Sequence, residues 1–360
     1  MTEQRKVLVT GAGGFIGGRA VEVLHATGHW RVVGGVRRWS SAARIGRFPV
    51  EIALCDVTSP VSVRRAIAGV SHVVHCAVGS REVTVDGTRN VLQAAREAGV
   101  RRLVHVSTID VYGSDAGELL ESQPLRRTGA LYGDTKIEAE EACLAAAAAG
   151  LPLTILRPSI VYGPFSKLWI VEFAQRLQRR PWPLPRERAG GICNAVYVDD
   201  VIQGVLLGLE HPGAVGEAFN INGAEWPTWF DYFTALNEHM GLPPIAAESP
   251  ALASLHAWVT KPVRDAAKFA LRRFQPQITA LYQRSSLAKR AMKRTEAMLL
   301  AAPTPGEFRL YGRTATYPTT KAQRMLSYRP RFPLDDGLRL SAAWLRHHGF
   351  ILSGHERPVT

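Results

Sequence analysis

The chain has 360 residues, of which 46% are hydrophobic and 21% are charged, and its net charge is +13 at pH 7. These proportions are typical of a globular protein of about two domains, and they exclude a disordered or fibrous chain. No stretch approaches the roughly 18 uncharged apolar residues of a membrane-spanning helix, and the N-terminus lacks the apolar core of a secretion signal. We therefore expect a cytoplasmic protein. Its four well-separated cysteines indicate reduced thiols rather than a metal site or a disulfide framework.

Short apolar runs alternate with helical patterns through the first 165 residues. The runs predict strands at residues 6–10, 32–36, 51–54, 72–76, 103–107 and 153–156. Helical spacing lies between them, as in residues 91–98 and 137–149. This alternation predicts an α/β fold with a doubly wound parallel sheet. Two more strands are expected at 194–198 and 218–221.

The loosening of this pattern after residue 165 suggests two domains. A nucleotide-binding Rossmann domain would comprise residues 1–165 with about 194–210. A smaller, mostly helical substrate domain would comprise 166–193 and 211–360, with a basic helical insertion at about 250–302. Residues 250–300 contain ten basic and two acidic side chains, so they carry +8 of the net charge. This block suits an anionic substrate, an anionic membrane surface or a solvated helix face. No nucleic-acid-reading module accompanies the charge, so nucleic-acid binding is not expected.

A glycine-rich loop follows the first predicted strand. The sequence from residue 10 to residue 17 is Thr-Gly-Ala-Gly-Gly-Phe-Ile-Gly, which places glycines at 11, 14 and 17. Such glycines permit a tight turn and let the backbone approach a pyrophosphate, while the next helix directs its free N–H groups at the anion. The position between a strand and a helix therefore predicts a dinucleotide site.

Arg37 and Arg38 occupy the place where an NAD-preferring site usually carries an acidic residue. Two guanidinium groups suit a 2′-phosphate and offer no acceptor to a free 2′-hydroxyl. The sequence thus favours NADP(H), with NAD(H) as the alternative. Asp56, which follows the third strand, could bind the adenine or cap a helix.

Tyr132 and Lys136 lie four residues apart in a helical pattern, which places the phenol and the ammonium on one face. A nearby cation favours phenolate, so we expect Lys136 to lower the pKa of Tyr132 and make it a general acid/base. Ser107 and Thr108 end a predicted strand and would bring hydroxyls to the same sheet edge.

These motifs, in this order, resemble the extended short-chain dehydrogenase/reductase superfamily, of the NAD-dependent epimerase/dehydratase type. The motifs are T-G-x-x-G-x-x-G at 10–17, V-S-T-x-x-V-Y-G at 106–113, Y-x-x-x-K at 132–136, L-R-P-S-I-V-Y-G-P at 156–164 and V-Y-V-D-D at 196–200. The resemblance covers about residues 5–235 and 315–350. It implies that Tyr132 is the acid/base, that Lys136 holds the nicotinamide ribose and that Thr108 hydrogen bonds to the reacting oxygen.

The resemblance also implies which residues contact the ligands, and it implies no metal. The expected cofactor contacts are Gly11, Gly14, Phe15, Ile16, Gly17, Arg37, Arg38, Asp56, Val57, Ala77, Ser107, Tyr132, Lys136, Pro158 and Ser159. The expected substrate contacts are Val78, Thr108, Asp110, Arg176 and Asn194.

Three positions depart from the family pattern. Thr84 replaces the usual asparagine of N-V-x-G-T. Sugar-nucleotide members often carry an arginine before V-x-V-D-D, where this chain has Cys193 and Asn194, so a diphosphate would need another partner such as Arg176. The acidic pair that follows the threonine in 4,6-dehydratases is Ile109 and Asp110 here, which disfavours elimination of water.

The favoured function is hydride transfer between a nicotinamide and a secondary alcohol or ketone of a sugar or sugar-nucleotide-like substrate, as an epimerase (isomerase) or an oxidoreductase. One alternative is an NADPH-dependent reductase or dehydrogenase of a lipid-like or isoprenoid-linked substrate at a membrane surface. Another is a non-catalytic protein that senses a dinucleotide. An anionic small-molecule substrate is expected, and a homodimer and peripheral contact with an anionic membrane remain open.

Overall fold

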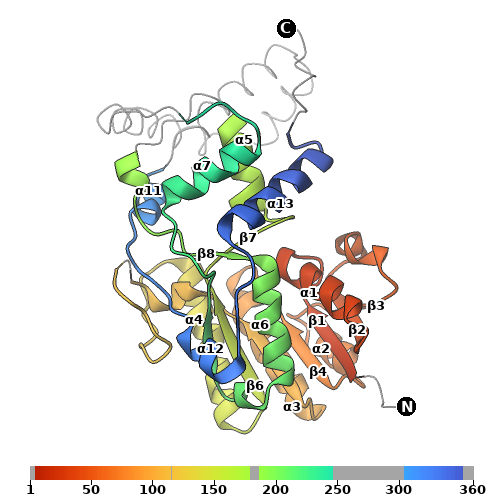
Figure 1. Cartoon of the computed structure of the whole chain (residues 1–360). Coiled ribbons are helices and arrows are strands. Elements are labelled where there is room, and N and C mark those ends of the chain that lie inside the picture. Colours follow the sequence, from red (N-terminus) through yellow and green to blue (C-terminus); the bar gives the residue numbers. More distant parts are fainter. Residues whose placement is uncertain (1–4, 115, 179–185, 246–303, 352–360) are drawn as a thin grey trace, which may run out of the picture. The chain divides into compact units, whose positions relative to one another are not determined.

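In the computed structural model, the described residues are 5–114, 116–178, 186–245 and 304–351 (Figure 1). The chain divides into two compact units, each assembled from separate stretches of sequence. Unit 1 comprises Met1–Tyr162, Asn194–Glu225 and Ala315–Leu334. Unit 2 comprises Gly163–Cys193, Trp226–Thr314 and Asp335–Thr360.

The observed division differs from the sequence-based one in two places. Residues 211–225 and 315–334, which we expected in the second domain, belong to unit 1. The first of these stretches contributes a strand to the main sheet. The second is tied to that strand, because the Lys321 ammonium donates to the Ala218 carbonyl over 2.9 Å. Local sequence patterns did not reveal either long-range contact.

Unit 1 is built on a seven-stranded sheet with the order β3-β2-β1-β4-β5-β6-β9, in which neighbouring strands run parallel. These strands are β1 (Arg5–Thr10), β2 (Trp30–Val36), β3 (Glu51–Leu54), β4 (His72–His75), β5 (Arg102–Val106), β6 (Leu153–Pro158) and β9 (Ala218–Ile221). A second, two-stranded parallel sheet is formed by β7 (Ile160–Tyr162) and β8 (Ala195–Tyr197). The predicted doubly wound parallel sheet is therefore confirmed.

Two groups of helices cover the main sheet (Figure 1). One group comprises α1 (Phe15–Ala26) and α6 (Val198–Glu210), which pack against each other. The other comprises α2 (Pro60–Ile67), α3 (Gly87–Glu97) and α4 (Leu131–Ala148). The short α12 (Thr320–Leu326) contacts β9. With helices on both faces the central strands are buried on both sides, which explains their continuous apolar runs.

One hydrophobic core of unit 1 lies between the sheet and the second group of helices. Leu8, Val73 and Leu103 are completely buried there, from three adjacent strands, against Ile67 of α2 and Val91 of α3. Branched and unbranched aliphatic side chains of this kind fill such a layer with few polar atoms to satisfy. This packing fixes the strand ends that carry the candidate site.

Unit 2 contains an aromatic core. Its described helices are α5 (Glu172–Gln178), α7 (Trp229–His239), α11 (Pro305–Tyr311) and α13 (Leu334–His347). The rings of Trp229 and Tyr311 have centroids 4.8 Å apart, and those of Phe173 and Phe233 have centroids 4.9 Å apart. No helix within the described ranges is long and apolar enough to cross a membrane. The predicted basic helices at 250–300 lie outside the described residues.

Candidate active site

The glycine-rich loop joins β1 to α1, as the sequence predicts. Gly11 has a positive φ of 66°, and a Cβ there would lie 2.9 Å from the backbone of Ala77. A Cβ at Gly17 would lie 2.4 Å from the Gly11 carbonyl oxygen. Gly14 precedes α1 without a side-chain cap. The first N–H groups of α1 therefore keep their capacity to bind an anion, and only glycine allows this close approach.

A cavity of about 460 Å³ opens beside this loop. It is bounded by the ends of β1, β2, β3 and β4, which meet at one edge because the strands are parallel. The predicted cofactor residues in its wall are Gly11, Gly14, Arg37, Asp56, Val57 and Ala77. The open helix end, the glycine cradle and the guanidinium group of Arg37 together fit the phosphates of a dinucleotide.

The two arginines that follow β2 are placed differently. Arg37 lies in the cavity wall, and Ser41 lies there with it. Arg38 is exposed and lies outside the wall, although its carbonyl accepts the Ser41 N–H over 2.9 Å. Asp56 does not cap α2, because the N-cap of that helix is Ser59, and its contact with the adenine stays a prediction. Its side chain accepts from the backbone and hydroxyl of Thr58 ahead of α2, and the residue also lines the cavity.

The threonine that replaces the usual asparagine holds the rim of this cavity. The Thr84 hydroxyl accepts the Gly79 N–H over 3.1 Å and donates to the Gly79 carbonyl over 3.3 Å. Gly79 and Ser80 are part of the wall. Below them the buried His75 bridges the hydroxyls of Thr10 and Thr88 at 2.7 and 3.0 Å. Burial lowers the pKa of His75 to about 3, so His75 is a neutral packing residue.

Tyr132 and Thr108 come together at the same sheet edge. Tyr132 lies in the first turn of α4 and its side chain is 50% exposed, while Thr108 follows β5 and is buried. Partial burial of the phenol and the nearby Asp110 carboxylate raise the pKa of Tyr132, and a hydrogen bond with the Thr108 side chain opposes them. At neutral pH the phenol is therefore protonated and can donate a proton.

This direction corrects the sequence-based expectation that Lys136 lowers the pKa of Tyr132. Lys136 is one helical turn further along α4, but its ammonium is buried and donates to the Val106 carbonyl over 2.7 Å. Burial lowers the pKa of Lys136 to about 8, although the Cys143, Cys76 and Glu140 side chains oppose this shift. Cys76 is also in the cavity wall, so Lys136 interacts electrostatically with a residue of that wall.

A buried polar network supports the strand ends from below. Glu140, one turn after Lys136, accepts from the Ser107 hydroxyl and from two nitrogens of Arg157, at 2.9 and 2.5 Å. Arg157 also donates to the Tyr112 hydroxyl over 2.8 Å, and that hydroxyl donates to Asn220 over 2.6 Å. All five side chains are 3% exposed or less, so each polar group depends on its partner in the network.

Several predicted contact residues are engaged elsewhere in the structure. The Ser107 hydroxyl is committed to Glu140, and that of Ser159 donates to Asn222 over 2.5 Å. Pro158 is buried at the end of β6. Phe15, Ile16 and Gly17 form the first turn of α1 and lie outside the cavity wall.

The predicted substrate residues are scattered. Val78 is 51% exposed and lines the cavity. Asp110 is beside Tyr132. Asn194 is buried and donates to the Ala315 carbonyl over 2.9 Å. Arg176 is ion-paired with Glu307 within unit 2, which occupies the charge that we expected to meet a diphosphate.

Other wall residues were not identified from the sequence. They include Ser41, Cys55, Cys76 and Ser80. Cys55 and Cys76 sit next to Asp56 and Ala77, so strand ends alone could have indicated them. Ser41 could not be found in this way, because a short 3-10 turn over Trp39–Ala42 brings it back to the glycine loop.

With this geometry established, comparison with known proteins defines the class. The model of the NAD dependent epimerase/dehydratase family matches residues 7–222. The chain belongs to this family, and it is an enzyme of the extended short-chain dehydrogenase/reductase type, as the motifs indicated.

The chain is similar to particular members of this class. It is 32% identical over 236 residues to sterol demethylase protein B of Methylococcus capsulatus, covering 60% of this chain and 69% of the relative. It is 30% identical over 271 residues to a 3 beta-hydroxysteroid dehydrogenase/Delta 5→4-isomerase of Mycobacterium tuberculosis, covering 67% and 70%. The fold matches UDP-glucuronic acid 4-epimerase from Bacillus cereus with a TM-score of 0.71 at 20% identity, covering 95% and 99%.

Proposed function

We propose that this chain is an NADP(H)-dependent oxidoreductase that interconverts a ketone and a secondary alcohol, and that it acts as a reductase at neutral pH. The observation that carries this proposal is a protonated Tyr132 beside Thr108, at the same sheet edge as a glycine-lined cavity with Arg37 in its wall. A bound nicotinamide dinucleotide would supply the hydride. The chain itself would supply the proton, the orientation of the carbonyl and the binding energy.

Tyr132 is the group that would complete the reduction. As negative charge develops on the carbonyl oxygen, the phenol donates its proton and the Thr108 hydroxyl hydrogen bonds to the same oxygen. The raised pKa of Tyr132 favours this direction, because a phenol is a donor without prior protonation. Oxidation of the alcohol requires the phenolate, so we expect its rate to rise with pH.

The titration of Lys136 should make cofactor binding depend on pH. Its pKa in the folded chain is about 8, against an ordinary value of 10.5. Above pH 8 the ammonium loses its charge, so we expect the affinity for NADPH to fall as pH rises. Between pH 8 and 10.5 the unfolded chain binds the extra proton, so this group stabilises the native state as pH rises. Titration of Lys136 therefore does not itself favour unfolding over this pH range.

Calorimetric titration with NADPH from pH 6 to 10 tests this assignment. Lys136→Arg keeps a positive charge at every pH in that range, so the variant should lose the dependence centred near pH 8. An unchanged pH profile in Lys136→Arg would assign the dependence to another group.

The choice of cofactor is proposed from Arg37. Charge-assisted hydrogen bonds are each worth about 1.5–3 kcal/mol, so removal of Arg37 should weaken NADPH binding roughly tenfold or more. Binding of NADH, which lacks the 2′-phosphate, should change little in Arg37→Ser. Arg38→Ala is the matched control, because Arg38 is adjacent in sequence but outside the cavity wall. Equal losses for both cofactors, or tighter NADH binding by the wild type, would reject the preference for NADP(H).

Two substrate classes follow from different observations. Arg176, the expected diphosphate partner, is engaged with Glu307, and Asn194, an expected substrate contact, is engaged with Ala315. The two curated relatives reported above are named for a sterol and a hydroxysteroid. Together these observations favour a lipid-like ketone with little negative charge. A sugar-nucleotide substrate is the second candidate, favoured by the family and by the fold of UDP-glucuronic acid 4-epimerase.

Turnover separates the two classes. A reductase of lipid-like ketones should consume added NADPH with a 3-ketosteroid and release its cofactor. An epimerase should convert a UDP-sugar without net consumption and should retain NAD through purification. Activity with only the UDP-sugar would overturn the preference for a lipid-like substrate.

A further inference from the structure

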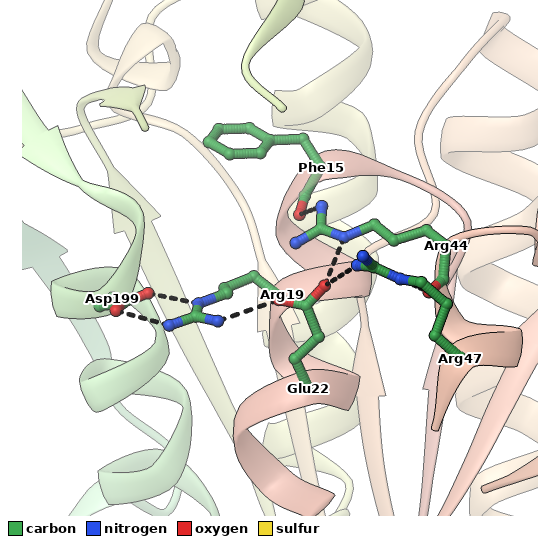
Figure 2. Close-up of polar contacts among 6 residues, drawn as sticks. All are labelled: Phe15, Arg19, Glu22, Arg44, Arg47 and Asp199. Carbon is green, nitrogen blue, oxygen red and sulfur yellow. Dashed lines mark hydrogen bonds and ion pairs between the residues drawn. The ribbon is translucent and has the colours of Figure 1, made fainter. Parts of the chain in front are cut away.

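A partly buried ionic cluster, with Glu22 and Arg44 as its most buried members, links α1 to the segment that follows β2 (Figure 2). At its centre is Glu22, whose side chain is 9% exposed. One Glu22 oxygen accepts from Arg44 over 2.7 Å and lies 3.6 Å from an Arg47 nitrogen. The other accepts from Arg19 over 2.9 Å, and Arg19 in turn makes two hydrogen bonds to Asp199, at 2.5 and 2.8 Å. Glu22 is thus the carboxylate that joins the two elements.

The charges around Glu22 strengthen its link between α1 and the segment that follows β2. Burial alone would raise the pKa of Glu22, but the hydrogen bonds and charges of Arg44 and Arg19 outweigh it and lower the pKa. Glu22 is therefore ionised at neutral pH. Arg44 is also bound to the start of α1, because it donates to the Phe15 carbonyl over 3.1 Å, and its side chain is only 10% exposed.

Residues 39–47, called the wall segment here, lie directly against the glycine loop and α1. A Cβ at Gly13 would lie 2.4 Å from the Ser41 carbonyl oxygen, and a Cβ at Gly18 would lie 2.9 Å from the Arg44 side chain. Ile45, completely buried, anchors the segment against Gly34 of β2. These contacts bring Ser41 into the cavity wall, beside Arg37.

We propose that Glu22 is a positioning residue for the adenosine half of the dinucleotide. By holding Arg44 it keeps the wall segment, and with it Ser41, against the glycine loop before the ligand arrives. Because the wall segment is already held in place, no conformational entropy is lost in ordering it when the ligand binds. Glu22 thereby raises the affinity for the dinucleotide without contacting it. This inference rests on the proposed dinucleotide site and deepens it, because it assigns a role to a residue outside the wall of the described cavity.

The test uses fragments of the cofactor, so that it does not depend on the substrate. ADP-ribose represents the adenosine half, and reduced nicotinamide mononucleotide represents the other half. In Glu22→Gln we expect ADP-ribose to bind at least tenfold more weakly by calorimetry. The mononucleotide, followed by its fluorescence, should bind the variant and the wild type within twofold. A purely structural role would weaken both fragments or neither.

Asp199→Asn is the matched control, because Asp199 belongs to the same cluster but binds only Arg19 in it, not the wall segment. It should leave ADP-ribose affinity within twofold of wild type. Arg44→Gln should reproduce the loss seen in Glu22→Gln, and the double variant should lose no more than either single variant, because both act through one contact. Arg44→Gln also serves if Glu22→Gln fails to fold.

The outcomes are distinguishable. Unchanged ADP-ribose binding in Arg44→Gln or Glu22→Gln would overturn the inference, as would an equal loss in Asp199→Asn. If the wild type itself binds neither ADP-ribose nor NADPH, the proposed function fails instead.

Discussion

Replacing Tyr132 by phenylalanine is expected to abolish turnover while leaving dinucleotide affinity within about twofold. The phenol is needed only as charge develops on the reacting oxygen, so its loss acts on the transition state and not on cofactor binding. General acid–base groups typically contribute about 10²–10⁴-fold in rate. Steady-state kinetics at saturating cofactor, with calorimetry for affinity, measure the two effects separately.

The structure also indicates in which direction of the reaction Tyr132 acts at neutral pH. The raised pKa of Tyr132 means that the proton is present at neutral pH, so reduction should depend on the phenol throughout the physiological range. Wild-type-like reduction by Tyr132→Phe would remove the proton donor from the mechanism. A loss of rate accompanied by an equal loss of NADPH binding would instead indicate that Tyr132 holds the cofactor.

The second large effect is on stability. Glu140→Gln preserves shape but leaves the guanidinium of Arg157, whose side chain is 4% exposed, without its carboxylate. Removing one partner of a buried ion pair typically costs about 3–5 kcal/mol, because the other charge remains desolvated. We expect the melting temperature to fall by roughly 10 °C, at about 2–4 °C per kcal/mol for a unit of this size.

Glu141→Gln provides the comparison on the adjacent residue of α4. Glu141 pairs with Arg127 over 2.6 Å, but both side chains are about half exposed, at 46% and 54%. Exposed pairs are worth roughly 0–1 kcal/mol, so this variant should melt near the wild type. Similar melting temperatures for Glu140→Gln and Glu141→Gln would show that the buried network does not stabilise unit 1 as inferred.

The sequence predicted the sheet well because its signals are local. Apolar runs bounded by turns identified every strand of the main sheet, and the glycine loop lies where its spacing placed it. What the sequence missed depends on distant contacts. The return of residues 315–334 to unit 1 includes the contact of α12 with β9 and the hydrogen bond from Lys321 to Ala218. No periodicity near residue 320 encodes that partner.

The candidate site also contains some residues that local sequence signals identify and others that depend on distant contacts. Gly11, Arg37 and Asp56 could be identified because each follows a predicted strand whose end faces the cavity. The direction of the Tyr132 pKa shift could not be identified, because it depends on the burial of the phenol and on the nearby Asp110 carboxylate. Four-residue spacing places Tyr132 and Lys136 on one helix face, but the Lys136 ammonium is held by the Val106 carbonyl. Ser41 and Glu22 required the three-dimensional path of the wall segment.

The most direct test of the proposed hydride transfer uses NADPH that carries deuterium at both C4 positions of the nicotinamide, so that either face delivers the label. The wild type would be incubated with the labelled cofactor and, separately, a 3-ketosteroid and a UDP-sugar, and the products analysed by mass spectrometry. We expect one deuterium on the carbinol carbon of the reduced ketone, and one deuterium transferred per NADPH consumed. Tyr132→Phe should transfer none. Product without deuterium, or transfer that persists undiminished in Tyr132→Phe, would contradict the proposed mechanism.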